Sequence, residues 1–253
     1  MHLVEQAINL KAAEKFENEA LLLRESLWML AKLEVGAEWS DMRDTRVGVL
    51  QAYLIALTEL GRVEEALIAQ RELVAILRDL QRRNQAGDPE GFATQLLCLS
   101  VMITSENESD EAAAAADEAV SLYRGLPASR RLMPRALEIL GLRLKRQGHH
   151  KDACAAHAEA VAIQRELGGD EARLQLGRLL TSLSGFHHDV GEMDAVLEVA
   201  QDAVNVRRAD WLEFPNDHEK TSALSLALVA CIAILQELRR FDEVVTLLRR
   251  TSN

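Results

Sequence analysis

The sequence is poor in residues that interrupt helices. Its 253 residues include only four prolines and thirteen glycines, whereas the strong helix formers Ala, Leu, Glu, Arg and Gln are abundant. Aromatic residues make up 4% of the chain, so the interior must be filled by Leu, Val, Ile and Ala. This composition argues against a thick globular core and predicts closely packed helices with almost no strand.

Basic charge, paired cysteines and long apolar runs are also scarce. The chain carries 29 Lys and Arg against 40 Asp and Glu, a net charge of −11, which disfavours nucleic acid and membranes as partners. Cys98, Cys154 and Cys231 are far apart, so we expect small buried thiols and neither disulfides nor structural zinc. With no leader pattern and no apolar stretch of roughly 18 residues, a cytoplasmic location is expected.

No motif for catalysis is present. The sequence contains no Walker-type glycine loop, no His-Glu-x-x-His and no strand-borne Gly-x-Ser-x-Gly. Adjacent residues on a helix point about 100° apart, so neither His149-His150 nor His187-His188 forms a chelate alone. We expect His187 to pack in the interior; the alternative is a zinc site spanning two repeats. The sequence therefore predicts no enzyme, cofactor or metal.

A repeat of 41 to 48 residues runs through the chain. Gly61, Gly148 and Gly191 each begin similar segments, and degenerate copies begin at Lys15, Asn107 and Arg239. Aliphatic residues stand eleven positions before each of these turn residues: Val4, Leu50, Leu96, Leu137, Leu180 and Leu228. Small residues stand five positions after: Ala20, Ala66, Ala112, Ala153, Val196 and Val244. Small side chains at fixed spacing allow two helices to approach within about 8–10 Å.

Each repeat therefore predicts a helical hairpin: helix A, a tight turn and helix B. Glycine at the turn provides the left-handed backbone that ends a helix, and Asp88-Pro89 supplies an N-cap followed by an N1 proline. The predicted A helices are 2–14, 42–60, 89–105, 130–147, 171–190 and 216–238. The predicted B helices are 17–34, 63–82, 109–124, 150–167, 193–209 and 241–250.

One segment resembles the tetratricopeptide repeat signature in the spacing of its small and large residues: Leu140-Gly141, the turn at Gly148, then Ala153 and Ala160. The long period is similar to the 42-residue variety found in kinesin light chains and bacterial regulators. This resemblance implies an all-α, right-handed α-solenoid in a single domain, residues 1–253. Its repeats would be 1–40, 41–87, 88–128, 129–169, 170–214 and 215–253.

In such a solenoid the A helices line a concave groove, where partners bind. Helix geometry places the residues thirteen, ten, six, three and two before each turn on that face. The predicted partner-binding residues are Gln51, Leu97, Val101, Arg135, Glu138, Lys145, Arg146, Arg178, His188 and Asp189. An open alternative is that the arginines merely pair with the carboxylates of Glu138 and Asp189.

We therefore interpret the chain as a protein-interaction module or scaffold, in signalling or otherwise, that binds a peptide or partner helix in its groove. The alternative is a receptor for a small molecule or peptide signal, with a deep pocket in place of the open groove. No capping helix follows the last repeat, and the first begins near Met1. This predicts either a piece of a longer protein or self-association through a terminal repeat.

Overall fold

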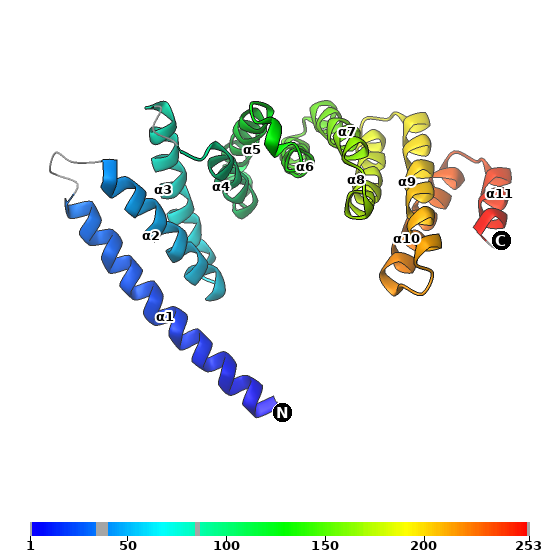
Figure 1. Ribbon diagram of the computed structural model, residues 1–253. Helices are drawn as coiled ribbons and strands as arrows, with labels where there is room; N and C mark the ends of the chain where they lie inside the picture. Colours follow the sequence, from blue (N-terminus) through cyan, green and yellow to red (C-terminus); the bar gives the residue numbers. More distant parts are fainter. Residues whose placement is uncertain (1, 34–39, 84–86, 252–253) are drawn as a thin grey trace. The chain divides into compact units, whose positions relative to one another are not determined.

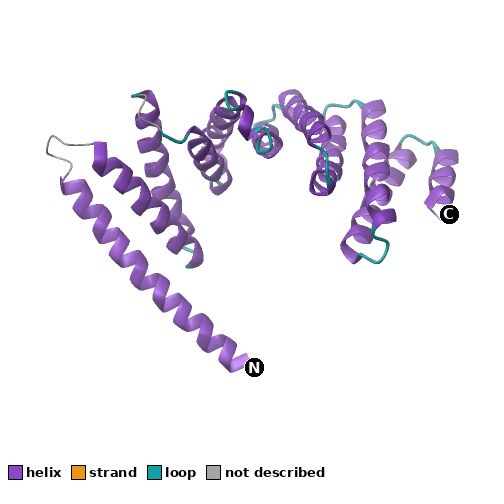
Figure 2. Ribbon diagram, in the orientation of Figure 1, coloured by secondary structure: helices purple, strands orange, loops and turns teal. Residues whose placement is uncertain are grey.

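A computed structural model describes the backbone of residues 2–33, 40–83 and 87–251, and side chains within 15–32, 43–83 and 87–247. All regular elements in these ranges are helices, joined by short turns (Figures 1 and 2). The α-helices are α1 (His2–Leu33), α2 (Ser40–Glu59), α3 (Val63–Arg82), α4 (Pro89–Met102), α5 (Ser109–Arg124), α6 (Met133–Arg146), α7 (His150–Leu167), α8 (Asp170–Asp189), α9 (Met193–Glu213), α10 (His218–Glu237) and α11 (Phe241–Thr251). Two 3-10 turns, η1 (Glu106–Glu108) and η2 (Pro127–Ser129), precede α5 and α6.

The helices form two compact units, Met1–Leu122 and Tyr123–Asn253. Within unit 1, α1 packs on α2, α2 on α3 and α3 on α4. Within unit 2, each helix from α6 to α11 packs on the next. Contacts between sequence neighbours are what a helical repeat protein requires, because each hairpin buries its apolar face against the following one. The all-α solenoid class is confirmed.

The helices of five of the six predicted hairpins are present, with bounds within a few residues of those expected. The first is wrong: α1 is one continuous helix through Lys15. The segment around Lys15 contains neither Gly nor Pro, so nothing in it offsets the roughly 1–2 kcal/mol that a left-handed residue costs. At Asn107 the chain turns through η1 without positive φ, because Ile103 has already left the helix with extended backbone.

The remaining four turns share one hydrogen-bonding motif. Gly61, Gly148, Gly191 and Arg239 have φ of 68°, 80°, 79° and 56°. In each, the next residue donates its N–H to a carbonyl five residues earlier, as Arg62 does to Leu57 at 2.9 Å and Arg240 to Leu235 at 2.8 Å. This is the Schellman arrangement, which satisfies the last carbonyls of a helix. Arg239 is the one described non-glycine residue with positive φ.

The small residues predicted at the hairpin contacts are buried. Ala20, Ala66, Ala112, Ala153 and Val196 are each at most 2% exposed, as are the aliphatic partners Leu50, Leu96, Leu137 and Leu180. Val244 and Leu228 are half-buried in the cluster joining α9, α10 and α11, and the side chain of Val4 lies outside the described range. The period thus marks the interior of both units, as the spacing predicted.

Asp88 caps α4 as predicted: its Oδ1 accepts the N–H of Gly91 at 2.8 Å, and Pro89 follows at the first helical position. The three cysteines are free thiols. Cys154 and Cys231 are buried as expected, but Cys98 is exposed on α4, because its neighbours Leu96, Leu97 and Leu99 occupy the buried side of that helix.

Candidate functional site

The predicted A-helix face exists in unit 2, on α6, α8 and α10. Lys145 on α6 pairs with Asp189 on α8 at 2.6 Å. One helix further, His188 on α8 lies 3.6 Å from Glu237 on α10. In both contacts, the first residue stands three positions before the turn residue of its repeat and the second stands two positions before the turn residue of the next repeat. The structure therefore brings the sequence-predicted residues of these helices onto a common surface, which we call the A face.

At one end of the A face, two arginines share one carboxylate. Glu138 is only 6% exposed, and its Oε2 accepts hydrogen bonds from Arg135 at 2.8 Å and Arg178 at 3.0 Å. Arg178 also donates to Gln175 at 2.7 Å. Arg135 and Arg178 pair with Glu138, as the alternative interpretation expected, whereas Asp189 pairs with Lys145 and not with an arginine. Two guanidinium groups on one carboxylate still leave a net positive charge and spare N–H donors.

A cavity of about 570 Å³ opens beside this triad, between α6 and the α7–α8 turn. Its lining includes Arg131 and Pro134 from the start of α6, Gln164 from α7 and Glu171 from α8, together with the triad. Gln164 is buried and donates to the carbonyl of Ala172 at 3.1 Å, which fixes the α7–α8 turn. A polar cavity of this size falls in the range of about 300–1,000 Å³ typical of ligand pockets.

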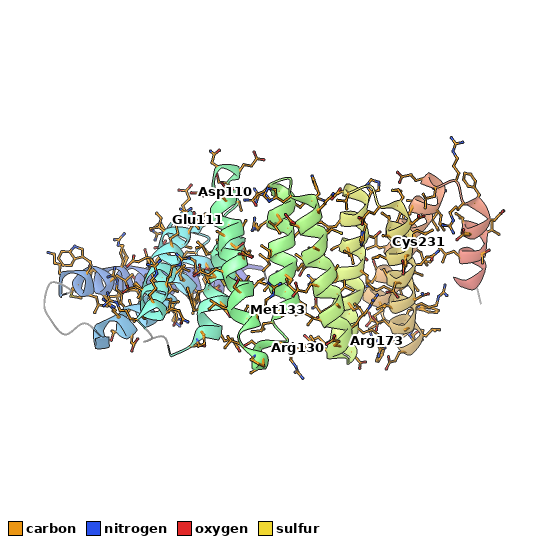
Figure 3. The ribbon with its side chains drawn as sticks, turned by 90° about the horizontal axis from the view of Figure 1, so that it is seen from above. Asp110, Glu111, Arg130, Met133, Arg173 and Cys231 are labelled. Atoms are coloured by element: carbon orange, nitrogen blue, oxygen red, sulfur yellow. The ribbon has the colours of Figure 1, made fainter. Side chains whose placement is uncertain are left out.

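Besides the His188–Glu237 contact, the A face carries exposed apolar side chains, most of them on α10. Leu142 on α6 and Leu226 and Val229 on α10 are exposed, the last two at 69% and 65%. Between them Gly185 on α8 has open space where a side chain would stand. Among the described helices, α10 is long and apolar enough to cross a membrane. It nevertheless packs against α9 and α11 through Leu224, Ala227, Cys231 and Leu235; Figure 3 labels Cys231. The A face thus has a charged end and an apolar end.

Behind the A face His157 of α7 is completely buried. Its ring contacts Phe186 with centroids 4.0 Å apart and planes tilted by 37°, and it packs against Gly141, where an added Cβ would lie 2.2 Å from Nδ1. Neither ring nitrogen makes a hydrogen bond of good geometry, although the carbonyl of Ala153 lies close enough to the ring to act on it. Burial lowers the pKa of His157 to about 4, although the nearby Glu138 opposes this shift. Gly141 of the repeat signature is therefore the space that His157 fills.

In unit 1 the predicted groove residues differ in their exposure to solvent. Gln51 on α2 and Val101 on α4 are exposed, as a binding surface requires. Leu97 is only 8% exposed, so its predicted role as an accessible contact is wrong. It follows Leu96 and precedes Leu99 in a helix whose apolar residues are spread around its circumference, and packing therefore covers it.

Sequence reasoning missed a ladder of ion pairs between B helices. It joins the residue seventeen after one turn to the residue eleven after the next, in the pairs Arg78–Glu118, Arg124–Glu159 and Arg165–Asp202. The first two measure 2.6 and 2.7 Å. Elsewhere in unit 2, Arg130 pairs with Glu166 and Arg173 with Glu213, and both arginines lie near one edge in Figure 3. Aligning charges at equal repeat positions would have revealed the ladder.

A second missed group combines Cys154 of α7, His187 of α8 and Glu192 before α9. The Sγ of Cys154 lies 3.5 Å from Nδ1 of His187, and Oε2 of Glu192 lies 2.7 Å from the same nitrogen. His187 was expected to pack in the interior, and its side chain is 17% exposed. His149 is exposed.

Solved structures similar to this one are helical repeat proteins. BtubC (BKLC) from P. vanneervenii matches with a TM-score of 0.63 and 13% identity, over 94% of this chain and 89% of that one. The TPR-like repeats of a putative kinesin light chain from Podosopora anserina match with a TM-score of 0.60 and 14% identity, over 84% and 94%. The apo form of RapI matches with a TM-score of 0.64 and 12% identity, over 97% and 64%.

Neither a protein-family model nor a curated protein sequence matches the chain. At these identities the structural likeness defines the fold, which is that of the TPR-like repeat proteins. The resemblance derived from the repeat signature is thereby supported at the level of architecture.

Proposed function

We propose that this chain is a protein-interaction module that binds a peptide or partner helix across the A face of unit 2. The observation that supports this most directly is the coexistence of two ends on one face. The Arg135–Glu138–Arg178 triad offers spare N–H donors to an acidic side chain, and exposed Leu226 and Val229 offer apolar contact. We further propose that the chain catalyses no reaction and that it works in the cytoplasm, where free thiols such as these three persist.

A partner with an acidic residue followed by apolar residues fits this face best. The carboxylate would meet Arg135 and Arg178 without displacing Glu138, because each guanidinium has five donors and the triad carries one positive charge in excess. The apolar residues would cover α10, where Leu226 and Val229 now face solvent. Burying one large apolar side chain contributes roughly 1.5–3 kcal/mol, so the apolar end would supply much of the affinity.

The test is selection of peptides from a random display library against the purified chain, followed by titration of the best peptide. The matched pair of variants is Leu226→Asp on the A face and Leu212→Asp on α9, because these leucines are 69% and 66% exposed. We expect Leu226→Asp to weaken binding roughly ten- to hundredfold, as for a central interface residue, and Leu212→Asp to leave it unchanged. Equal binding to both variants would refute the A face as the site.

A second candidate function is a receptor for a small ligand with an acidic group, which would bind in the cavity of about 570 Å³ beside the triad; Arg131, Arg135 and Arg178 line this cavity together with Glu138, Asp170 and Glu171. Such a ligand would depend on Arg131, which lines the cavity and is exposed, and would be indifferent to Leu226→Asp. A thermal-shift screen of carboxylate and phosphate metabolites on the Arg131→Gln variant and the parent chain separates the two functions.

A further inference from the structure

Three groups that bind transition metals converge at the junction of the fourth and fifth hairpins. Cys154 lies in the first turns of α7, His187 lies near the end of α8, and Glu192 immediately precedes α9. The Sγ, Nδ1 and carboxylate oxygen of these residues all lie within 4.8 Å of one another. The turn itself fixes two of them, because the N–H of Glu192 donates to the carbonyl of His187 at 3.0 Å.

The other repeats serve as an internal reference for this junction. Four residues before the turn, where His187 stands, the hairpins with the same turn have Leu57, Leu144 and Leu235. Six residues after the turn, where Cys154 stands, the next hairpin has Leu197. Leu197 and Leu235 belong to one buried apolar cluster. Cys154 and His187 thus replace an apolar contact by a thiol and an imidazole.

The third residue stands at a position that is polar in the other hairpins too. The position after the turn residue holds Arg62, Glu108, His149 and Arg240 in those hairpins, and here it holds Glu192, 2.7 Å from the Nδ1 of His187. Ordinary packing does not require Cys154 and His187 in place of apolar residues, and beside Glu192 they assemble a thiol, an imidazole and a carboxylate at one point. A transition-metal ion gives a single reason for this combination.

We propose that Cys154, His187 and Glu192 bind a zinc-like divalent ion. Bond lengths of about 2.3 Å to sulfur and 2.0–2.1 Å to nitrogen or oxygen place two ligands of a tetrahedral zinc roughly 3.3–3.6 Å apart. The Cys154–His187 separation of 3.5 Å already meets this. The Glu192 side chain is 59% exposed and moves outward slightly to admit the ion. Water completes the fourth position.

Binding would connect two repeats. Cys154 belongs to the B helix of one hairpin, and His187 and Glu192 flank the turn of the next, so the ion bridges α7 to the α8–α9 turn. A ligand that binds the folded state alone stabilises it by mass action. Metal would therefore raise the thermal stability of unit 2 without altering its helix content.

The test uses the full chain, reduced and freed of metal by a chelator, and titrated with Co²⁺ and then with Zn²⁺. We expect one Co²⁺ per chain, a thiolate-to-cobalt charge-transfer absorption and displacement by Zn²⁺. The Cys154→Leu/His187→Leu double variant restores the leucine pair of the next hairpin and should keep the helical circular dichroism. It should lose the absorption and bind at least about tenfold more weakly.

The matched control is His188→Ala, which removes the adjacent exposed imidazole and should leave Co²⁺ binding unchanged. Cys154→Ala replaces the double variant if that variant does not fold, and it should also remove the charge-transfer absorption. The inference is overturned if Co²⁺ does not bind at micromolar concentration, if it binds without thiolate absorption, or if the leucine variant binds as tightly as the parent chain.

Discussion

His157 should make the stability of unit 2 depend on pH between about 4 and 6.5. In the folded chain its imidazole is fully buried and has a pKa of about 4, whereas an unfolded histidine titrates near 6.5. Between these values the unfolded state binds more protons than the folded state, so stability falls as pH falls. The contribution is fully present above pH 6.5 and is lost progressively toward pH 4.

The magnitude follows from the two pKa values. Going from pH 7 to pH 5, protonation favours the unfolded state by about 2 kcal/mol, from 1.36 kcal/mol per pKa unit. His157→Leu removes this penalty, and the one group that it would leave without the imidazole is the backbone carbonyl of Ala153, which lies within α7. The imidazole faces Phe186 and Gly141, and Glu138 and Lys145 are the charged groups that act on it.

The assay is urea unfolding followed by circular dichroism at pH 7 and pH 5, for the parent chain and for His157→Leu. The other histidines are common to both proteins, so the difference between the two pH-induced changes isolates His157. We expect the parent chain to lose about 2 kcal/mol more than the variant. An equal loss in both proteins would show that His157 titrates normally, and hence that water reaches the ring.

Three further predictions concern local structure and are checked by the same unfolding measurement. Arg239→Gly should stabilise the last hairpin by about 0.5–1 kcal/mol, because glycine adopts the left-handed turn without steric cost. Gly191→Ala should destabilise its turn by a similar amount for the same reason. If Arg239→Gly destabilised the chain and Gly191→Ala stabilised it, the shared turn motif would be refuted. Gly141→Ala should destabilise by about 1–3 kcal/mol from overpacking against His157, and the loss should shrink in the double variant with His157→Ala. Asp88→Ala should cost about 1 kcal/mol through loss of the helix cap, and no change would show that solvent replaces it.

The sequence alone determined the helices of the last five repeats, four of their turns and most of their buried positions. In a repeat protein each unit contacts mainly its neighbours, so a period in the sequence is also a period in space. Ala66, Ala112 and Ala153 were therefore predictable as contact residues without knowledge of long-range pairing. The glycines at 61, 148 and 191 were equally predictable, because the left-handed turn is a property of a few adjacent residues.

Only the tertiary structure decided which side chains meet across repeats. Periodicity assigns a residue to a face but leaves open the offset between neighbouring helices, and this offset pairs Lys145 with Asp189 and brings Cys154 to His187 across 33 residues of sequence. The burial of Leu97 was decided in the same way, because exposure depends on what packs against a helix as well as on its own pattern. The continuity of α1 has a local cause instead: the weak turn signal at Lys15 yields to helix propensity.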